Sequence, residues 1–312
     1  MDMKNITVAG GGVLGSQIAF QSAYKGFAVK VWLRSEGSIG RAKPKFERLA
    51  GIYDAALSAM KENPAAYCRG LADSPDVSAD RIDELRERAA AAARSIEFTT
   101  SYEEAARDAD LVIEAIAEDP AQKTEFYREL AKHLPEKTIL ATNSSTLLPS
   151  MLAEATGRPG KYLALHFANE IWRNNTAEVM GHPGTDRAAY DAVVDFAAAI
   201  GMVPLRLRKE QPGYILNSML VPFLNSAQAL YATDVADPET IDATWRLATG
   251  APLGPFQILD IVGLETAYNI TAMHPQASDP DSVPGKIASL LKEKIDAGHT
   301  GVNAGEGFYR YR

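Results

Sequence analysis

The chain has 312 residues, 46% of them hydrophobic and 23% charged, which exceeds one ordinary core and predicts a globular protein of two domains. The net charge of −8 argues against nucleic acid or an anionic membrane as partner, and no apolar run approaches the ~20 residues that span a bilayer. A single cysteine, Cys68, excludes a disulfide scaffold and fits a reducing cytoplasm, and the few histidines form no cluster typical of a metal site.

The first element is an apolar strand over Ile6–Ala9, after a short polar start that does not resemble a signal peptide. It runs into the sequence GGGVLG, in which Gly10, Gly12 and Gly15 have the G-x-G-x-x-G spacing. Gly10 permits a tight turn, Gly12 lets a pyrophosphate approach the backbone, and Gly15 lets the helix pack closely on the strand. Alone, the pattern could be a glycine-rich turn without a ligand.

A second strand over Ala28–Leu33 completes a compact strand–helix–strand unit. The helix between the strands begins at Val13 and Leu14, whose free N–H groups can bind phosphate. This context predicts a dinucleotide site for a nicotinamide or flavin cofactor.

The end of the second strand bears on the choice of cofactor. An NAD site usually has Asp or Glu here, whereas this chain has Leu33, followed by Arg34 and Ser35. Arg34 and Ser35 can bind a 2′-phosphate, which favours NADP slightly over NAD. The alternative is that Arg34 is a solvated charge and Glu36 reaches back to the ribose.

A long insert over Ser38–Arg94 reads as two charged helices joined by a loop at Asn63–Ser78, a helical hairpin standing off the sheet. The alternative for any one of its lysines is a place on a solvated face. Cys68 lies in the loop without a neighbouring histidine, and we interpret it as a spectator thiol.

Strand-like runs then alternate with helical stretches. Further strands are predicted over Ile96–Thr99, Leu111–Ala117, Thr138–Thr142, Tyr162–Phe167, Ala177–Met180 and Val203–Leu207, with helices such as Gln122–His133 and Arg187–Ile200. Apolar strands alternating with helices indicate an α/β fold, a doubly wound and mainly parallel Rossmann-type domain over residues 1–208.

The pattern becomes purely helical after Lys209. Helices are predicted over Tyr214–Tyr231, Pro238–Thr249, Leu259–Ala272 and Lys286–Ala297. Residues 210–213 form a natural hinge, so an all-helical domain is expected over residues 209–312, with a ligand in the cleft between the domains.

Two polar side chains follow the strand that ends in LHFAN. His166 at the carboxyl end of this strand could move a proton while a cofactor moves a hydride, and Asn169 lies in the exit loop. Glu178 on the next strand could support the imidazolium if the strands are neighbours. The alternatives are a histidine satisfied at the core rim and a surface carboxylate.

The sequence ATNSST at 141–146 ends another strand. Asn143 and Ser145 could donate to a substrate oxygen or to the nicotinamide carboxamide. Ser144, Ser145 and Thr146 are equally suited to cap a helix N-terminus, and different hydroxyls could do both.

Several motifs in one order give a more specific indication. They are GGGVLG, LVIEAIAE (111–118), TNSST (142–146), LHFAN (165–169), AEVMG (177–181), PGYILNSMLVPFL (212–224), GAPLGPFQILDIVGLETAY (250–268) and GEGFYRY (305–311). With them the chain resembles the short-chain L-3-hydroxyacyl-CoA dehydrogenase family over nearly its whole length.

The resemblance implies roles for individual residues. It implies a catalytic dyad at His166 and Glu178, with Ser145 and Asn217 contacting the substrate. It also implies that Asn169 lies at the substrate and Glu114 beside the nicotinamide half of the cofactor. The helical domain would form a homodimer.

The chain departs from the family in two places. Where the family commonly has HFFNP, this chain has HFANEIWRNNTAE, with Glu170 for the proline and Trp172 in a loop that borders the acyl pocket. This variant is closer to a diketoreductase branch that acts on free β-dicarbonyl or β-keto ester compounds. The other departure is Leu33, where the family usually has aspartate.

These observations predict an oxidoreductase that transfers a hydride between NAD(P) and C3 of a 3-hydroxy or 3-oxo acyl compound, such as a CoA thioester. The alternatives are a diketoreductase-like enzyme and a catalytically silent NAD(P)-binding protein. A hydroxyacid dehydrogenase of the 6-phosphogluconate type would need a lysine as proton carrier, and the strand-end motifs contain none.

Overall fold

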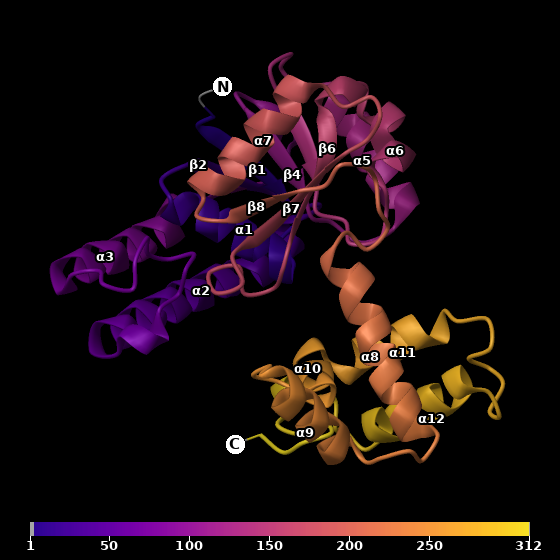
Figure 1. Cartoon of the computed structure of the whole chain (residues 1–312). Helices are drawn as coiled ribbons and strands as arrows, with labels where there is room; N and C mark the ends of the chain where they lie inside the picture. Colours follow the sequence, from indigo (N-terminus) through magenta and orange to yellow (C-terminus); the bar gives the residue numbers. More distant parts are fainter. Residues whose placement is uncertain (1–2, 312) are drawn as a thin grey trace. The chain divides into compact units, whose positions relative to one another are not determined.

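A computed structural model describes residues 3–311 of the chain, which divides between Ile215 and Leu216 into two compact units (Figure 1). The first unit holds the sheet and its helices, and the second is helical. The sequence places the change of pattern at Lys209, within the segment that leads from the last strand to this division.

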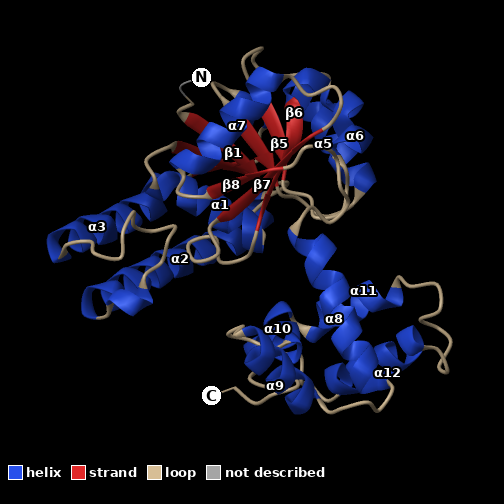
Figure 2. Ribbon diagram, viewed as in Figure 1, coloured by secondary structure: helices blue, strands red, loops and turns tan. Residues whose placement is uncertain are grey.

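The first unit is built on one eight-stranded sheet in the order β3-β2-β1-β4-β5-β6-β7-β8 (Figure 2). Its strands are β1 Asn5–Ala9, β2 Ala28–Trp32, β3 Glu97–Thr99, β4 Leu111–Glu114, β5 Ile139–Thr142, β6 Tyr162–Phe167, β7 Thr176–Gly181 and β8 Val203–Arg206. All neighbours pair in parallel except β6 and β7, which are antiparallel. The expectation of a mainly parallel, Rossmann-type sheet is confirmed, and strands are present in all eight predicted places.

Helices cover both faces of this sheet. They are α1 Val13–Tyr24, α4 Tyr102–Ala106, α5 Pro120–Ala131, α6 Pro149–Leu152 and α7 Arg187–Ala199. Side chains of β4 alternate between two cores, because Leu111 and Ile113 join one apolar cluster and Val112 joins the other. Burial on both faces explains why the central strands read as continuous apolar runs.

The predicted hairpin consists of α2 Glu36–Glu62 and α3 Ala79–Ser95, which pack against each other and against α1. One side of α2 is buried along Phe46, Leu49, Tyr53 and Leu57, at the three- and four-residue spacing of a helix face. The hairpin is therefore part of the main core on its inner side, and its charges occupy the outer side.

The helical unit contains α8 Leu216–Ala232, α9 Pro238–Thr249, α10 Pro255–Val262, α11 Leu264–Ala272 and α12 Val283–Asp296. The single helix predicted over Leu259–Ala272 is wrong, because the chain breaks at Gly263 (φ +93°), a conformation that glycine adopts without strain. The Asp260 carboxylate accepts hydrogen bonds from the N–H groups of Phe308 and Tyr309, which fixes the C-terminal segment on α10. Across residues 3–311, no helix is both long and apolar enough to cross a bilayer.

Candidate functional site

A glycine cradle lies at the carboxyl end of β1. If Gly10 (φ +119°) had a Cβ atom, that atom would lie only 2.3 Å from the carbonyl oxygen of Ala115. A Cβ atom on Gly15 would likewise lie 2.3 Å from the carbonyl oxygen of Gly10. A Cβ on Gly12 would meet nothing within 4 Å, and α1 begins at Val13 without a side-chain cap. Two glycines thus allow close packing, while the third faces open space beside uncapped helical N–H groups. This arrangement fits a dinucleotide pyrophosphate.

Polar and basic side chains follow β2 at the same edge of the sheet. Leu33 is buried close to Gly11. A Cβ atom on Gly11 would lie 3.1 Å from a methyl carbon of Leu33 and would also meet the side chain of Ala42. Arg34 is exposed, and Ser35 caps α2 by accepting from the Ser38 N–H. The Arg41 guanidinium donates to the Ser38 hydroxyl at 2.9 Å, so this edge carries two arginines and two serines.

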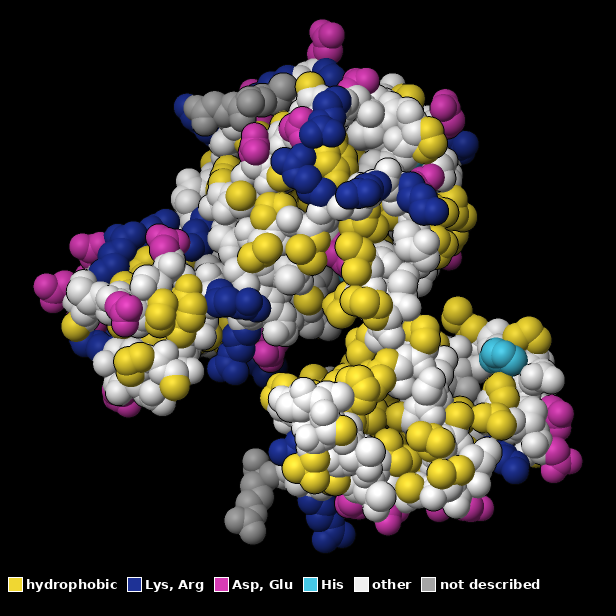
Figure 3. All heavy atoms as spheres, in the orientation of Figure 1, with side chains coloured by type: hydrophobic (Ala, Val, Ile, Leu, Met, Phe, Trp, Pro, Cys, Tyr) yellow, Lys and Arg dark blue, Asp and Glu magenta, His cyan; other side chains and the backbone are white. Residues whose placement is uncertain are grey.

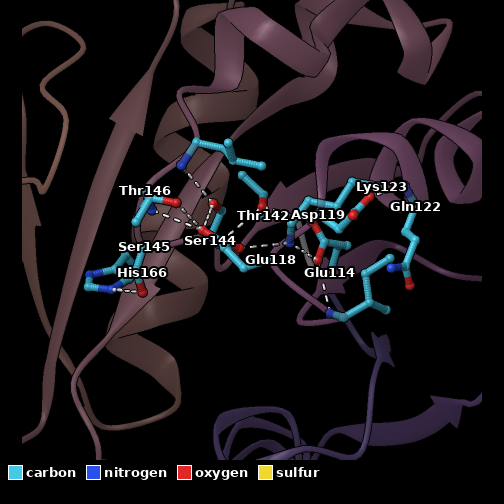
Figure 4. A network of polar contacts seen from close by, with 12 residues as sticks. Glu114, Glu118, Asp119, Gln122, Lys123, Thr142, Ser144, Ser145, Thr146 and His166 are labelled. Carbon is cyan, nitrogen blue, oxygen red and sulfur yellow. Dashed lines mark hydrogen bonds and ion pairs between the residues drawn. The ribbon is translucent and has the colours of Figure 1, made fainter. Parts of the chain in front are cut away.

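The most distinctive polar arrangement lies where β5 and β6 end. His166 and Glu178 are register partners on β6 and β7, with Nδ1 and Oε2 3.1 Å apart. On the other side of the ring, Nε2 lies 3.1 Å from Oγ of Ser145, as Figure 4 shows. His166 and Glu178 are 6% and 3% exposed, whereas Ser145 is half-buried. A hydroxyl, an imidazole and a carboxylate therefore lie in a line that runs inward from the surface, an arrangement suited to proton transfer.

The loop that carries Ser145 is held by Glu118, which the sequence reasoning missed. The Glu118 carboxylate accepts hydrogen bonds from the hydroxyls of Ser144 and Thr146 and from the Thr146 N–H (Figure 4). Burial alone would raise the pKa of Glu118, but these bonds and the Lys123 ammonium hold it below its ordinary value. The sequence signal that could have identified Glu118 is the second glutamate of the motif LVIEAIAE. The alternative of a helix cap at residues 144–146 is wrong, because α6 is capped at Leu148.

Asn143 lies at the end of β5 and is buried. Its side-chain oxygen accepts from the Phe167 N–H at 3.1 Å, which ties the ends of β5 and β6 together. This contact fixes the position of His166 relative to Ser145. The contact of Asn143 with a cofactor stays a prediction.

Glu114 lies at the end of β4, in the interior of the first unit. Its carboxylate is 0% exposed and lies 2.5 Å from the Lys123 ammonium, which is itself buried. The hydroxyls of Tyr127 and Thr142 and the Ile116 N–H also donate to it. These partners enclose the carboxylate, so Glu114 holds the ends of β4 and β5 together. Its place beside the nicotinamide half of the cofactor stays a prediction.

Trp172 lies in the loop between β6 and β7. It is 5% exposed, and its ring packs 5.5 Å from the ring of Tyr53 on α2. The carbonyl oxygen of Trp172 accepts a hydrogen bond from the N–H of Gly70 in the hairpin loop. The two backbones are so close that a Cβ atom on Gly70 would lie 2.9 Å from the Trp172 backbone. The side chain therefore anchors the 169–175 loop to the hairpin. The contact of Trp172 with a substrate stays a prediction. Asn169, in contrast, is exposed.

Asn217 lies in the first turn of α8, in the helical unit, and its contact with substrate stays a prediction. Sequence reasoning also missed Tyr214, which follows the predicted hinge. Its ring stacks on that of His166 with centroids 4.3 Å apart. No group of three or more His, Cys, Asp or Glu side chains with the geometry of a metal site occurs within residues 3–311.

Comparisons with known proteins agree with this geometry. Residues 5–211 match the model of the 3-hydroxyacyl-CoA dehydrogenase NAD-binding domain, and residues 213–311 match that of the 3-hydroxyacyl-CoA dehydrogenase C-terminal domain. The mitochondrial hydroxyacyl-coenzyme A dehydrogenase of Sus scrofa is 33% identical over 99% of this chain and 92% of its own. A probable 3-hydroxybutyryl-CoA dehydrogenase of Deinococcus radiodurans is 31% identical over 97% of this chain and 99% of its own.

Among solved structures, a diketoreductase described for its dual catalysis of dicarbonyl compounds is 48% identical, with a TM-score of 0.86 over the full length of both chains. The two family models together account for residues 5–311 apart from Pro212. The chain belongs to the 3-hydroxyacyl-CoA dehydrogenase family.

Proposed function

We propose that this protein is an NAD(P)-dependent oxidoreductase that interconverts a 3-hydroxy and a 3-oxo acyl compound. The line of Ser145, His166 and Glu178 carries the proposal, because it lies at the same edge of the sheet as the glycine cradle. Ligands of open α/β sheets bind outside this edge.

The residues of the first unit have distinct tasks in this reaction. A nicotinamide cofactor held at the glycine cradle would take up the hydride from C3 in oxidation and would supply it in reduction. In oxidation, His166 Nε2 removes the hydroxyl proton, while the Glu178 carboxylate holds the Nδ1–H tautomer and balances the developing positive charge. Ser145 Oγ, 3.1 Å from Nε2, holds the reacting oxygen. We assign Asn217 to the same oxygen by its place in the family motif.

Two substrate classes remain candidates. The hydroxyacyl-CoA relatives favour a CoA thioester. The 48% identity to the diketoreductase favours a free β-dicarbonyl or β-keto ester, as does the HFANEIW loop. Because Trp172 is buried, this preference rests on the other residues of the loop, such as the exposed Asn169 and Glu170.

The discriminating experiment compares reduction of acetoacetyl-CoA with reduction of a free β-keto ester, each with NADH and NADPH. We expect turnover with at least one substrate, measured by cofactor oxidation, and a higher kcat/KM for one class assigns the branch. Binding of cofactor without turnover of either substrate would contradict the proposal and favour the silent NAD(P)-binding protein.

The chain has the NAD-binding domain of its family, and within this activity we favour NADP slightly over NAD. Three features support the preference. Leu33 cannot accept hydrogen bonds from ribose hydroxyls, Arg34 is exposed, and Arg41 lies on Ser38 next to the Ser35 cap. Arginine and serine donors together suit a phosphate.

We further propose a homodimer formed through the helical unit. Large hydrophobic side chains are exposed there, including Met219 (63%), Leu247 (86%), Ile261 (56%) and Met273 (77%), and Figure 3 shows hydrophobic side chains gathered over this unit. Contiguous exposed apolar surface of this kind typically marks a protein interface. We also place the enzyme in the reducing cytoplasm, which its one cysteine, the free and buried Cys68, fits.

A further inference from the structure

The imidazole of His166 has an aromatic contact in addition to its contact with Glu178. The Tyr214 ring lies flat on the imidazole, with centroids 4.3 Å apart and an interplanar angle of 13°. Tyr214 is 1% exposed, so the stack is shielded from water. Glu178 and Ser145 contact the two nitrogens in the plane of the ring, whereas Tyr214 covers one face.

Tyr214 is itself fixed at both ends. Its hydroxyl donates to the Ser144 carbonyl oxygen at 2.7 Å, in the loop that carries Ser145. Its backbone has φ +53°, a rare conformation for a residue with a side chain, and follows Gly213 at φ +77°. The N–H of the next residue, Ile215, donates to Glu178 Oε1 at 2.8 Å. One short segment therefore contacts the histidine, its carboxylate partner and the serine loop.

We propose that Tyr214 is a positioning residue that fixes the plane of the His166 ring and stabilises its protonated form through the face of the phenol. This inference rests on the proposed function, in which His166 exchanges a proton with the substrate. An aromatic face attracts a cation, and the attraction grows when both groups are desolvated. The stack thus favours the imidazolium that donates the proton in reduction.

The surroundings are consistent with a neutral phenol. Burial raises the pKa of Tyr214, and the neighbouring phenol and carboxylates raise it further. The Tyr214 hydroxyl therefore stays a donor to Ser144 across the working pH range. The ionisable groups whose charge acts on Tyr214 are Tyr162 on β6, Glu118 after β4, Glu178 on β7 and Glu114 at the end of β4. Of these, Glu178 also contacts the His166 imidazole.

The test separates the ring from the hydroxyl. Tyr214→Phe keeps the ring, Tyr214→Leu removes it, and a ring-fluorinated phenylalanine at position 214 keeps its shape while withdrawing electron density from its face. For each variant, kcat, KM and the pH profile of kcat/KM in reduction are measured. The titration of the His166 imidazole is followed by NMR without substrate, with its signal assigned from His166→Asn.

We expect Tyr214→Leu to lower kcat by roughly 10- to 100-fold with little change in cofactor KM, because the proton carrier is misplaced. Both Tyr214→Leu and the fluorinated variant should move the alkaline loss of activity and the imidazole titration to lower pH than in Tyr214→Phe, because the cation loses the face of the ring. Tyr214→Phe should keep the wild-type midpoints of the pH profile and of the imidazole titration, and its kcat should fall only about threefold.

The control is Tyr190→Phe. The Tyr190 hydroxyl also donates to backbone carbonyl oxygens of the sheet region, those of Val179 and Leu207, but no ring contact joins Tyr190 to His166 among the described residues. Wild-type imidazole titration in the fluorinated variant would overturn the proposal, even if Tyr214→Leu failed to fold. Because the NMR readout needs no turnover, an inactive wild-type protein would contradict the proposed function alone.

Discussion

His166 and Glu178 face each other directly across the antiparallel pair of β6 and β7, with Nδ1 and Oε2 3.1 Å apart. β7 is the strand at which the sheet reverses direction, so the carboxylate comes to the carboxyl end of β6 only because of this reversal. Both side chains are buried, which strengthens their electrostatic interaction.

Removal of the proton carrier is the first prediction. His166→Asn should lower kcat by ~10²–10⁴-fold, the usual cost of losing a general acid–base, while cofactor binding stays nearly unchanged. Glu178→Gln should cost less, because an amide oxygen can still accept the Nδ1–H but no longer balances the charge. Steady-state kinetics and cofactor titration by fluorescence measure both effects. Near-normal turnover in His166→Asn would refute the assignment.

Much of this fold could be predicted because its signals are local. Apolar strands, the glycine spacing and the break at Pro212–Gly213 each leave a mark within a few residues of sequence. The burial of Trp172 and of Glu114 could not be predicted, because it depends on packing against the hairpin and on the ion pair with Lys123. Glu118 and Tyr214 were missed for the same reason: their partners Ser144 and His166 are distant in sequence.

The second prediction concerns pH and the serine loop. The pKa of Glu118 is lower in the folded protein than its ordinary value of about 4.5. The ionised Glu118 carboxylate therefore stabilises the fold fully above about pH 4.5, and this stabilisation is lost as the pH falls through the folded-state pKa. Glu118→Gln should therefore reduce the acid sensitivity of unfolding below about pH 4.5 and lower kcat by loosening Ser145. Thermal unfolding between pH 3 and 7 checks this. An unchanged pH dependence would contradict the role of this carboxylate.

The third prediction concerns the buried pair of Glu114 and Lys123. Lys123→Met leaves a buried carboxylate without its cation and should destabilise the fold by about 3–5 kcal/mol. Glu114→Gln combined with Lys123→Met should recover most of this loss. Lys132→Met is the matched control, because its pair with Glu129 is exposed and is worth less than about 1 kcal/mol. Chemical denaturation measures all three, and equal effects of the two lysine substitutions would contradict the argument.

The fourth prediction concerns assembly. Leu247 is 86% exposed on α9, so Leu247→Glu costs little in the isolated subunit, whereas it would place a charge in an apolar interface. We expect the wild-type protein to be a dimer by light scattering and Leu247→Glu to shift it toward the monomer. The control is Met151→Glu, on an apolar side chain of the first unit that is 61% exposed, which should leave the dimer intact. A wild-type monomer would exclude the homodimer.

The last prediction concerns the choice between NAD and NADP. An exposed arginine that binds a 2′-phosphate contributes to NADP binding and nothing to NAD binding, so Arg34→Ala should raise the KM for NADPH by roughly tenfold and leave that for NADH unchanged. Arg41→Ala should act in the same direction, because its guanidinium lies on Ser38 beside the Ser35 cap. Leu33→Asp should favour NADH over NADPH, since a carboxylate at this position accepts hydrogen bonds from the ribose hydroxyls and repels a 2′-phosphate. The control is Arg48→Ala, an exposed arginine further along α2. A wild-type preference for NADH that Arg34→Ala and Arg41→Ala leave unchanged would exclude the phosphate site, and Glu36 would then be the residue to test at the ribose.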